Sequence, residues 1–212
     1  MITTDVIRHM LRESAETKLA AQALADDIAT FAQWMSETYD HDGKVILFGN
    51  GGSLCDAAHI AAELVGRYKR ERRGLPAIAL VEPALLTALG NDYDYSTVFT
   101  RQVQAWTKPG DLVVGISTSG KSVNVLAALR VARRQGAKTV ALTGANGESM
   151  REVANLVLAV PSTNTPRIQE CHIAIGHIVC ELVEQCLEEQ MTGHNESRPP
   201  ETAWAPTAGE GD

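Results

Sequence analysis

The segment GISTSGKS, residues 115–122, combines glycines with hydroxyl side chains in an order that suits phosphate binding. It fits the pattern G-x-x-x-x-G-K-[ST], in which backbone N–H groups surround nucleotide phosphates and the lysine reaches the terminal ones. The run that follows it, SVNVLAALRVARRQG, has helical spacing, and the N-terminus of a helix attracts anions. Four hydroxyls within six positions exceed what one helix cap requires. We therefore predict a receptor for one phosphate, with plain helix capping as the alternative; its hydroxyls belong to Ser117, Thr118, Ser119 and Ser122.

Nucleotide hydrolysis is an alternative that the surrounding sequence does not favour. Gly115 lies inside the apolar run DLVVGIST, so a strand should continue through Ile116 and leave a loop shorter than a nucleotide-binding one. A nucleotide hydrolase also needs an acidic residue at the end of another apolar strand to organise Mg²⁺. Glu82 stands at such a place, but Pro83 directly after it predicts a plain turn.

The segment FGNGGS, residues 48–53, is a second turn in which glycine and polar residues follow an apolar run. Its glycines allow a ligand to approach the backbone closely. It does not match G-x-G-x-x-G, and no acidic residue follows at the distance that a ribose requires, so a dinucleotide site is not predicted. Two such turns could converge on one small phosphorylated ligand, and a sugar phosphate fits better than a cofactor.

His59 and Glu63 are candidates for acid–base or metal chemistry. They are four residues apart on an expected helix and therefore share one face, although such pairs are also common on solvated helices. Gln169 and His177 lie in the mostly apolar stretch RIQECHIAIGHIVCELVEQC, where an uncharged polar group must find a partner or cost stability. For His172 in the same stretch, we prefer a buried core or interface histidine.

Asn91 and Asp92 follow a glycine in the stretch ALGNDYDYS. They would either form a turn or donate and accept hydrogen bonds with sugar hydroxyls.

Five short apolar runs indicate the sheet that positions these residues. They alternate with helical stretches at 56–67, 123–135 and 149–153, and strands that are apolar on both faces imply a parallel sheet covered on both sides. We predict an α/β fold with a doubly wound, flavodoxin-like sheet, preceded by N-terminal helices over about forty residues and followed by a long C-terminal helix over 167–189. Ligands of such sheets bind beyond the carboxyl ends of the strands, where the strand order reverses.

Composition indicates one globular domain of an ordinary kind. The chain has 212 residues, of which 44% are hydrophobic and 21% charged, and its formal net charge is −7, so no nucleic-acid partner is predicted. No apolar run approaches the length of a membrane span, and the four cysteines show no C-x-x-C spacing. With no signal peptide, we expect a cytoplasmic protein with one domain at 1–190 and a disordered tail at 191–212.

Several segments resemble the sugar-isomerase (SIS) domain family, and more closely its phosphoheptose isomerase branch. They are GNGGSLCDAAHIAAELVGRY, AIALVEPALLTALGNDYDYSTVFTRQV, GDLVVGISTSGKSVNVLAAL and RIQECHIAIGHIVCELVE, and the resemblance runs from about Lys18 to Leu187. It implies a cytoplasmic homotetramer with a five-stranded sheet and a bound Zn²⁺. It also implies conversion of sedoheptulose 7-phosphate to D-glycero-D-manno-heptose 7-phosphate through an enediol, the first step toward nucleotide-activated heptose.

The resemblance also assigns residues to roles. Glu63 and His177 match the acid–base pair, and Asn91 and Asp92 would bind substrate hydroxyls. The hydroxyls of residues 117–122 would bind the phosphate, and both Glu63 and Gln169 would contact the substrate. The first turn would line the sugar-phosphate site with Asn50, Gly51, Gly52 and Ser53, and the metal ligands would be His59, Glu63, Gln169 and His177.

A related branch of the family is a non-enzymatic tetramer that binds the bacterial replication initiator, and it stays as the alternative function. That branch carries non-catalytic residues at the positions of Glu63 and His177, whereas this chain keeps both, which favours the enzyme.

The spacing of Gln169 and His177 adds a geometric expectation. Eight residues of α-helix separate positions by roughly 12 Å along the axis and about 80° around it, so one ion cannot easily bind both from a straight helix. We therefore predict that the site lies at a subunit interface, or that the helix begins irregularly near Gln169.

Overall fold

The structure is a computed structural model that describes residues 2–193. Its five strands are β1 (Val45–Gly49), β2 (Ala77–Ala79), β3 (Leu112–Ser117), β4 (Lys138–Gly144) and β5 (Leu156–Val160). The α-helices are α1 (Thr4–Ala20), α2 (Ala25–Asp40), α3 (Gly52–Val65), α4 (Pro83–Asp92), α5 (Thr100–Trp106), α6 (Val123–Arg134), α7 (Glu148–Arg151) and α8 (Thr165–Gly193), and 3₁₀ turns η1 and η2 cover Ala21–Leu24 and Tyr95–Thr97.

The strands form one parallel sheet in the order β2-β1-β3-β4-β5. This is the flavodoxin-like order, so the predicted doubly wound five-stranded sheet is confirmed. The order reverses between β1 and β3, where Gly49 pairs with Ile116 at the carboxyl edge. The two glycine- and hydroxyl-rich turns that the sequence singles out both start at this edge, because each directly follows one of these two strands.

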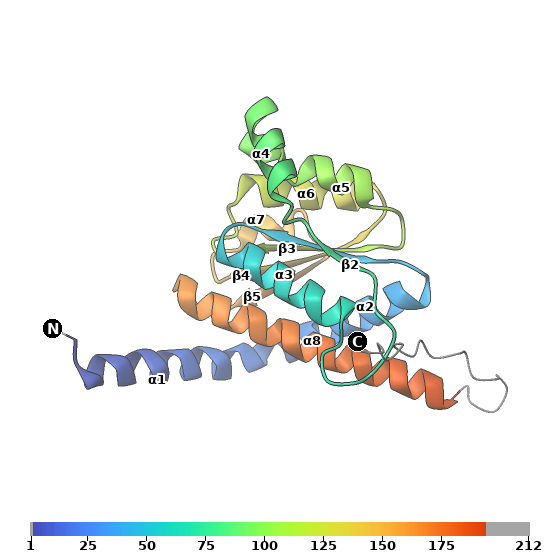
Figure 1. The fold of residues 1–212 in the computed structure, drawn as a ribbon. Helices are drawn as coiled ribbons and strands as arrows, with labels where there is room; N and C mark the ends of the chain where they lie inside the picture. The colour runs from blue at the N-terminus through green and yellow to red at the C-terminus, as the bar shows by residue number, and fades with distance from the viewer. Residues whose placement is uncertain (1, 194–212) are drawn as a thin grey trace, which may run out of the picture.

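Helices cover both faces of the sheet, and the alternation of side chains along each strand decides which layer a residue joins. In β1, Val45 and Leu47 pack with the layer of α2, α3 and α8, whereas Ile46 and Phe48 pack with the layer of α5, α6 and α7. Figure 1 shows these two layers on opposite sides of the strands. Every residue of β1 and β3 is buried, so the two strands that meet at the switch point have a rigid position.

Helix α1 extends beyond the main body, as Figure 1 shows, and none of its residues is buried. Its contacts with the rest of the chain are mainly with α8. Ser14 Oγ donates to Glu170 Oε2 at 2.5 Å, and the Arg167 guanidinium donates to the carbonyl of Met10 at 2.7 Å. The N-terminal helices that the sequence predicts are present, but α1 leaves much apolar surface exposed.

The helix α4 corrects one prediction. Glu82 and Pro83 were expected to form a plain turn, but they start a helix, because the Glu82 carboxylate accepts from Ala84 N–H at 3.2 Å and proline suits the first helical position. Asn91 and Asp92 are therefore the last residues of a helix rather than turn formers, and the Asn91 amide donates to the Asp92 carboxylate at 2.9 Å.

The ends of the long elements also differ from prediction. Helix α3 begins at Gly52 rather than at residue 56, because Gly51 adopts a positive φ of 55° and turns the chain directly into the helix. Helix α8 runs from Thr165 to Gly193, so residues 191–193 of the expected tail continue it, and residues 194–212 lie outside the described range. Within residues 2–193, no helix has the length and apolar character needed to cross a membrane.

Candidate active site

The turn between β1 and α3 brings backbone N–H groups to the switch point. Gly51 is the N-cap of α3, and no side chain caps this helix end. The N–H of Ser53 bonds the carbonyl of Asn50 at 3.1 Å, which closes the turn tightly. A Cβ atom on Gly52 would lie 2.5 Å from Nε2 of Gln169, so glycine at this position leaves room for that amide. The structure thus joins the first turn to α8 through Gln169.

The turn between β3 and α6 gathers three serine hydroxyls. Ser117 Oγ lies 2.9 Å from Ser122 Oγ and 3.5 Å from Ser119 Oγ. Ser122 is the N-cap of α6, yet its side chain makes no capping hydrogen bond to that helix. The alternative of plain capping therefore does not describe Ser122, and its hydroxyl faces the other serines at the N-terminus of α6.

The backbone of the β3–α6 turn differs from that of a nucleotide-binding loop. Gly115 lies within β3, as predicted, and the strand continues to Ser117, so the loop starts later than the pattern requires. Gly120 has a φ of 67°, and a Cβ there would lie 2.5 Å from the Cα of Gly147. The carbonyl of Thr118 accepts from Gly144 N–H at 3.1 Å, and Lys121 is exposed.

Asn124 links the two turns, and sequence reasoning missed it. The side-chain amides of Asn50 and Asn124 donate to each other's oxygens at 2.9 Å in both directions. The Asn124 oxygen also accepts from the N–H of Val125, and Tyr95 donates its hydroxyl to the Asn50 oxygen at 3.1 Å. These bonds determine the orientation of both amides. They join segments 74 residues apart, so no local pattern could reveal them.

A cluster of three ionisable groups lies between α3 and α8. His59 Nε2 is 3.1 Å from Glu63 Oε1 and 3.4 Å from His177 Nε2. One ligand atom of each residue lies within 4.8 Å of the others, which is close enough for all three to bind one ion. The side chains of His59 and Glu63 are 48% and 24% exposed, so the cluster is accessible from solvent.

The two helices approach closely enough to form this cluster because α8 carries glycine at the contact. A Cβ on Gly176 would lie 2.7 Å from the Cδ1 and Cγ1 atoms of Ile60. Gly52 contacts Gln169 and Ile60 contacts Gly176, so the helices run side by side in the same direction. We refer to His59, Glu63 and His177 as the His–Glu–His cluster.

Gln169 is not part of the His–Glu–His cluster within one chain. Its amide packs on Gly52 at the first turn of α3, whereas His59 lies seven residues further along that helix. Helix α8 starts at Thr165 and includes both Gln169 and His177, so an irregular start at Gln169 is not observed. The structure thus brings His59, Glu63 and His177 together, and the expected part of Gln169 in metal binding stays a prediction.

Other titratable groups near the site have different environments. His172 is fully buried and its Nε2–H donates to the carbonyl of Thr143 at 3.1 Å, which agrees with the predicted core histidine. Burial lowers the pKa of His172 to about 4. Burial also raises the pKa of Asp56, one turn before His59, while the charge of His59 acts in the opposite direction.

Tyr68 is a further neighbour of the cluster that sequence reasoning missed. Its ring stacks on the imidazole of His177, with 5.4 Å between ring centroids and 26° between planes. It lies in the segment between α3 and β2, where no motif in the sequence points to the site.

Comparison with known families decides the affiliation of the chain. The model of the SIS domain matches residues 10–144. The chain belongs to the SIS domain family. It is 52% identical over 186 residues to phosphoheptose isomerase from Aquifex aeolicus, covering 87% of this chain and 97% of that protein. It is 50% identical over 183 residues to phosphoheptose isomerase from Akkermansia muciniphila, covering 86% and 97%.

Solved structures agree with this affiliation. Phosphoheptose isomerase GmhA from Neisseria gonorrhoeae superposes with a TM-score of 0.81 at 37% identity, covering 85% of this chain and 98% of that one. The phosphoheptose isomerase from Francisella tularensis gives a TM-score of 0.83 at 37% identity, covering 87% and 100%. The matched range of the SIS domain, residues 10–144, includes both switch-point turns, His59 and Glu63, whereas Gln169 and His177 on α8 lie beyond it.

Proposed function

We propose that this SIS-domain protein is a phosphoheptose isomerase. It converts sedoheptulose 7-phosphate to D-glycero-D-manno-heptose 7-phosphate through an enediol, the first step toward nucleotide-activated heptose. The observation that carries this proposal is the His–Glu–His cluster, whose ligand atoms lie within 4.8 Å of one another in a chain that is about half identical to phosphoheptose isomerases.

The reaction moves a proton between C1 and C2 of the sugar, so it needs a base at carbon and an acid at the carbonyl oxygen. We assign the base to Glu63 and the acid to His177. Glu63 lies on α3 and His177 on α8, and both are joined through His59, which contacts Glu63 at 3.1 Å and His177 at 3.4 Å. These contacts are compatible with a proton relay over short distances.

The donor set of the cluster fits Zn²⁺. Two imidazole nitrogens and one carboxylate oxygen are ligands that zinc accepts, and three protein ligands leave a position open for substrate. When bound, zinc would polarise the carbonyl and hydroxyl oxygens of the sugar. A carboxylate oxygen that binds an ion is not free to take a proton, so Glu63 cannot perform both tasks with the same atom at the same time.

The phosphate of the substrate would bind at the β3–α6 turn. Ser117, Ser119 and Ser122 direct hydroxyls toward one another at the N-terminus of α6, and the first turn adds N–H groups at the edge of the same sheet. Asn50, held by Asn124, would contact the sugar, as would Gln169. Asn91 and Asp92 are exposed at the end of α4 and do not belong to this turn. We propose that they bind hydroxyl groups of the sugar.

We further propose a homotetramer with active sites at subunit interfaces. Glu63 lies eleven residues after Gly52 on α3, hence about 16 Å along the axis, which exceeds the reach of a single sugar phosphate bound at the first turn. Exposed apolar side chains on α1 support an interface that would bring a second copy to the site. They are 49–65% exposed and belong to Val6, Ile7, Met10, Leu11 and Leu19.

The four cysteines are free thiols, which is compatible with the reducing cytoplasm that we expect for this enzyme. The non-enzymatic alternative, binding of a replication initiator, is not favoured, because the relatives described above are named as isomerases.

The direct test is incubation of the purified chain with sedoheptulose 7-phosphate and Zn²⁺, followed by NMR detection of the aldose. We expect the aldose signals to grow to an equilibrium mixture. If the folded protein, supplied with zinc, leaves the ketose unchanged, the isomerase proposal is overturned. The non-enzymatic alternative, binding of a replication initiator, would then be favoured.

A further inference from the structure

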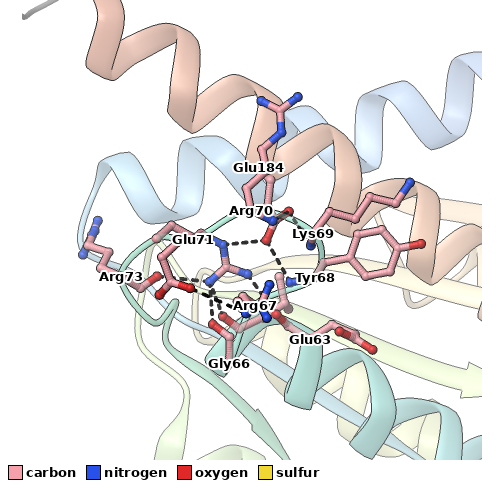
Figure 2. Close-up of polar contacts among 11 residues, drawn as sticks. Glu63, Gly66, Arg67, Tyr68, Lys69, Arg70, Glu71, Arg73 and Glu184 are labelled. Atoms are coloured by element: carbon pink, nitrogen blue, oxygen red, sulfur yellow. Dashed lines mark hydrogen bonds and ion pairs between the residues drawn. The ribbon is translucent and has the colours of Figure 1, made fainter. Parts of the chain in front are cut away.

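The segment between α3 and β2, residues 66–76, has no regular secondary structure, yet it has a fixed position on α8. Glu184 of α8 accepts hydrogen bonds from the backbone N–H groups of Tyr68 and Lys69 at 2.9 Å and of Arg70 at 3.0 Å. Three consecutive N–H groups around one carboxylate form an anion-binding concavity of the kind called a nest. Figure 2 shows Glu184 reaching into this concavity from its helix.

Arg72 closes the other side of the same carboxylate. Its Nε–H donates to Glu184 at 3.0 Å, and the two side chains are 8% and 1% exposed. The remaining guanidinium nitrogens donate to the carbonyls of Glu63 and Leu64 at 2.9 Å. Arg72 therefore satisfies orphan carbonyls at the C-terminus of α3 with a favourable positive charge. The segment is thus joined both to α8 and to the helical turn that carries Glu63.

These bonds place the Tyr68 ring against His177. The two rings are nearly parallel, with 5.4 Å between centroids, and the His59 ring meets His177 edge-on at 5.0 Å. Lys69 lies 5.4 Å above the Tyr68 ring and forms an ion pair of 2.8 Å with Glu181, one turn after His177. The Tyr68 ring is therefore held by its own loop and not only by its contact with the histidine.

His177 needs an external restraint of this kind. A histidine that binds metal is usually oriented by a hydrogen bond from its second ring nitrogen to a carboxylate or carbonyl. Among the residues that the structure describes, the polar partner of the His177 ring is His59, at Nε2, and Nδ1 has none. Ring stacking is then the contact that can select its rotamer.

We propose that Tyr68 is a positioning residue for His177, and that the nest around Glu184, closed by Arg72, determines where Tyr68 lies. The inference rests on the proposed role of the His–Glu–His cluster. Tyr68 itself takes no proton and binds no metal; its ring keeps Nε2 of His177 directed at His59 and Glu63. The hydroxyl of Tyr68 has no part in this role.

The test compares Tyr68→Leu, Tyr68→Phe and the unchanged full chain. Zinc affinity is measured by calorimetry on metal-free protein, and kcat and KM are measured with sedoheptulose 7-phosphate. For Tyr68→Leu we expect zinc affinity to fall about tenfold or more, the usual effect of losing a residue that orients a ligand, and kcat to fall at least fivefold with KM within about twofold. Tyr68→Phe, which keeps the ring, should stay within about twofold of the unchanged chain in all three quantities.

Glu71→Ala is a control in the same segment, because Glu71 is 90% exposed and contacts only Arg67 among the partners recorded for it. It should change neither zinc affinity nor kcat. Unchanged zinc affinity and kcat in Tyr68→Leu would overturn the proposal, and so would an equal loss in Tyr68→Phe or an effect on KM alone. If the unchanged chain neither binds zinc nor turns over substrate, the proposed function fails and this inference fails with it; if it turns over without zinc, kcat alone decides.

Discussion

At the scale of single residues, the candidate site consists of side chains that the sequence singles out, but whose orientations and contacts only the structure gives. His59 and Glu63 share a helix face, as their spacing predicts, and the structure adds His177 at 3.4 Å from His59. Two roles are expected of the Glu63 carboxylate, because it should both take a proton from carbon and bind the metal ion.

Glu63→Gln tests the first of these tasks. The amide keeps the size and an oxygen but cannot accept a proton at working pH, so kcat should fall at least a hundredfold, the usual contribution of a general base. The circular dichroism spectrum and the oligomeric state should not change, because within residues 2–193 the hydrogen-bond partner of the Glu63 side chain is His59. Retention of more than a tenth of the activity would assign the base to another group.

His172 makes stability depend on pH. Its pKa is lowered to about 4 in the folded protein by burial, whereas the unfolded chain has the ordinary value near 6.5. The unfolded state therefore binds the proton first as pH falls, and the free energy of unfolding should decrease between about pH 6.5 and 4, by about 3 kcal/mol in total. Above pH 6.5 this group contributes no pH dependence.

The comparison is with His172→Gln, whose amide can still donate toward the Thr143 carbonyl but does not titrate. Urea unfolding at pH 7.0, 6.0 and 5.0 should show a smaller loss of stability in the variant than in the unchanged chain. Parallel profiles for the two proteins would contradict the assignment.

At the scale of elements, the fixed segment 66–76 is the least expected part of the molecule. A basic run such as RYKRERR, residues 67–73, is typical of a solvated surface. In the structure, however, Arg72 is buried and caps α3, and the backbone of the segment encloses Glu184. Burial alone would raise the pKa of Glu184; the N–H groups of residues 68–70 and the Arg72 charge outweigh it and lower the pKa below the usual range.

Glu184→Gln should therefore destabilise the fold by roughly 3 kcal/mol or more at pH 7, because it leaves the buried Arg72 charge without its partner. A carboxyl with a lowered pKa contributes its stability above its unfolded pKa and loses it as pH falls through the folded value, so the difference between the two proteins should shrink below about pH 4. Chemical denaturation at pH 7 and pH 3.5 measures both effects.

Glu181→Gln is the matched control. Glu181 is 40% exposed and pairs with Lys69, and exposed ion pairs contribute about 1 kcal/mol or less. Equal losses in the two variants would contradict the claim that burial of Glu184 matters.

The strands, and the place of the β3–α6 turn between a strand and a helix, could be predicted because local signals mark them. Unbroken apolar runs mark buried parallel strands, and Gly115 within such a run shows that the loop starts later than the nucleotide pattern requires. Glu82 and Pro83 carried a local signal too, for a helix start, but it was interpreted as a turn.

The contacts that orient the site could not be predicted, because they join distant segments. The Asn50–Asn124 pair and the stacking of Tyr68 on His177 depend on how β1, β3, α3 and α8 pack. Helical geometry shows that Gln169 and His177, eight residues apart on α8, cannot easily bind one ion from a straight helix, but it does not reveal that the Gln169 amide packs on Gly52.

At the scale of the whole molecule, we propose that helix α1 packs against another copy of the chain. The helix has no buried residue and carries several large exposed apolar side chains, as a helix that is covered in an interface would. The distance of about 16 Å along α3 between the first turn and Glu63 also supports an active site at a subunit interface.

Leu11→Asp tests this assembly. Leu11 is 65% exposed, so a charge there costs little in a monomer but opposes burial in an interface. We expect sedimentation to show dissociation of the tetramer into smaller species, and isomerase activity to fall in parallel. His9→Asp, the same charge on a more polar side of α1, should leave the tetramer intact; a monomeric unchanged chain with full activity would contradict the interface proposal.

The turns proposed to recognise the substrate are separated in the chain from Glu63 and His177, and this separation has a consequence for how the function could evolve. The β1–α3 turn, at the edge of the proposed phosphate site, begins α3, whereas Glu63 lies about three turns later and His177 comes from a different helix. Exchanging those two residues would leave the serine hydroxyls and the Asn50–Asn124 bridge untouched. The protein would then still recognise a phosphorylated sugar without transforming it, so that a metabolic catalyst could become a sensor of its former substrate through two substitutions at a distance from the recognition turns.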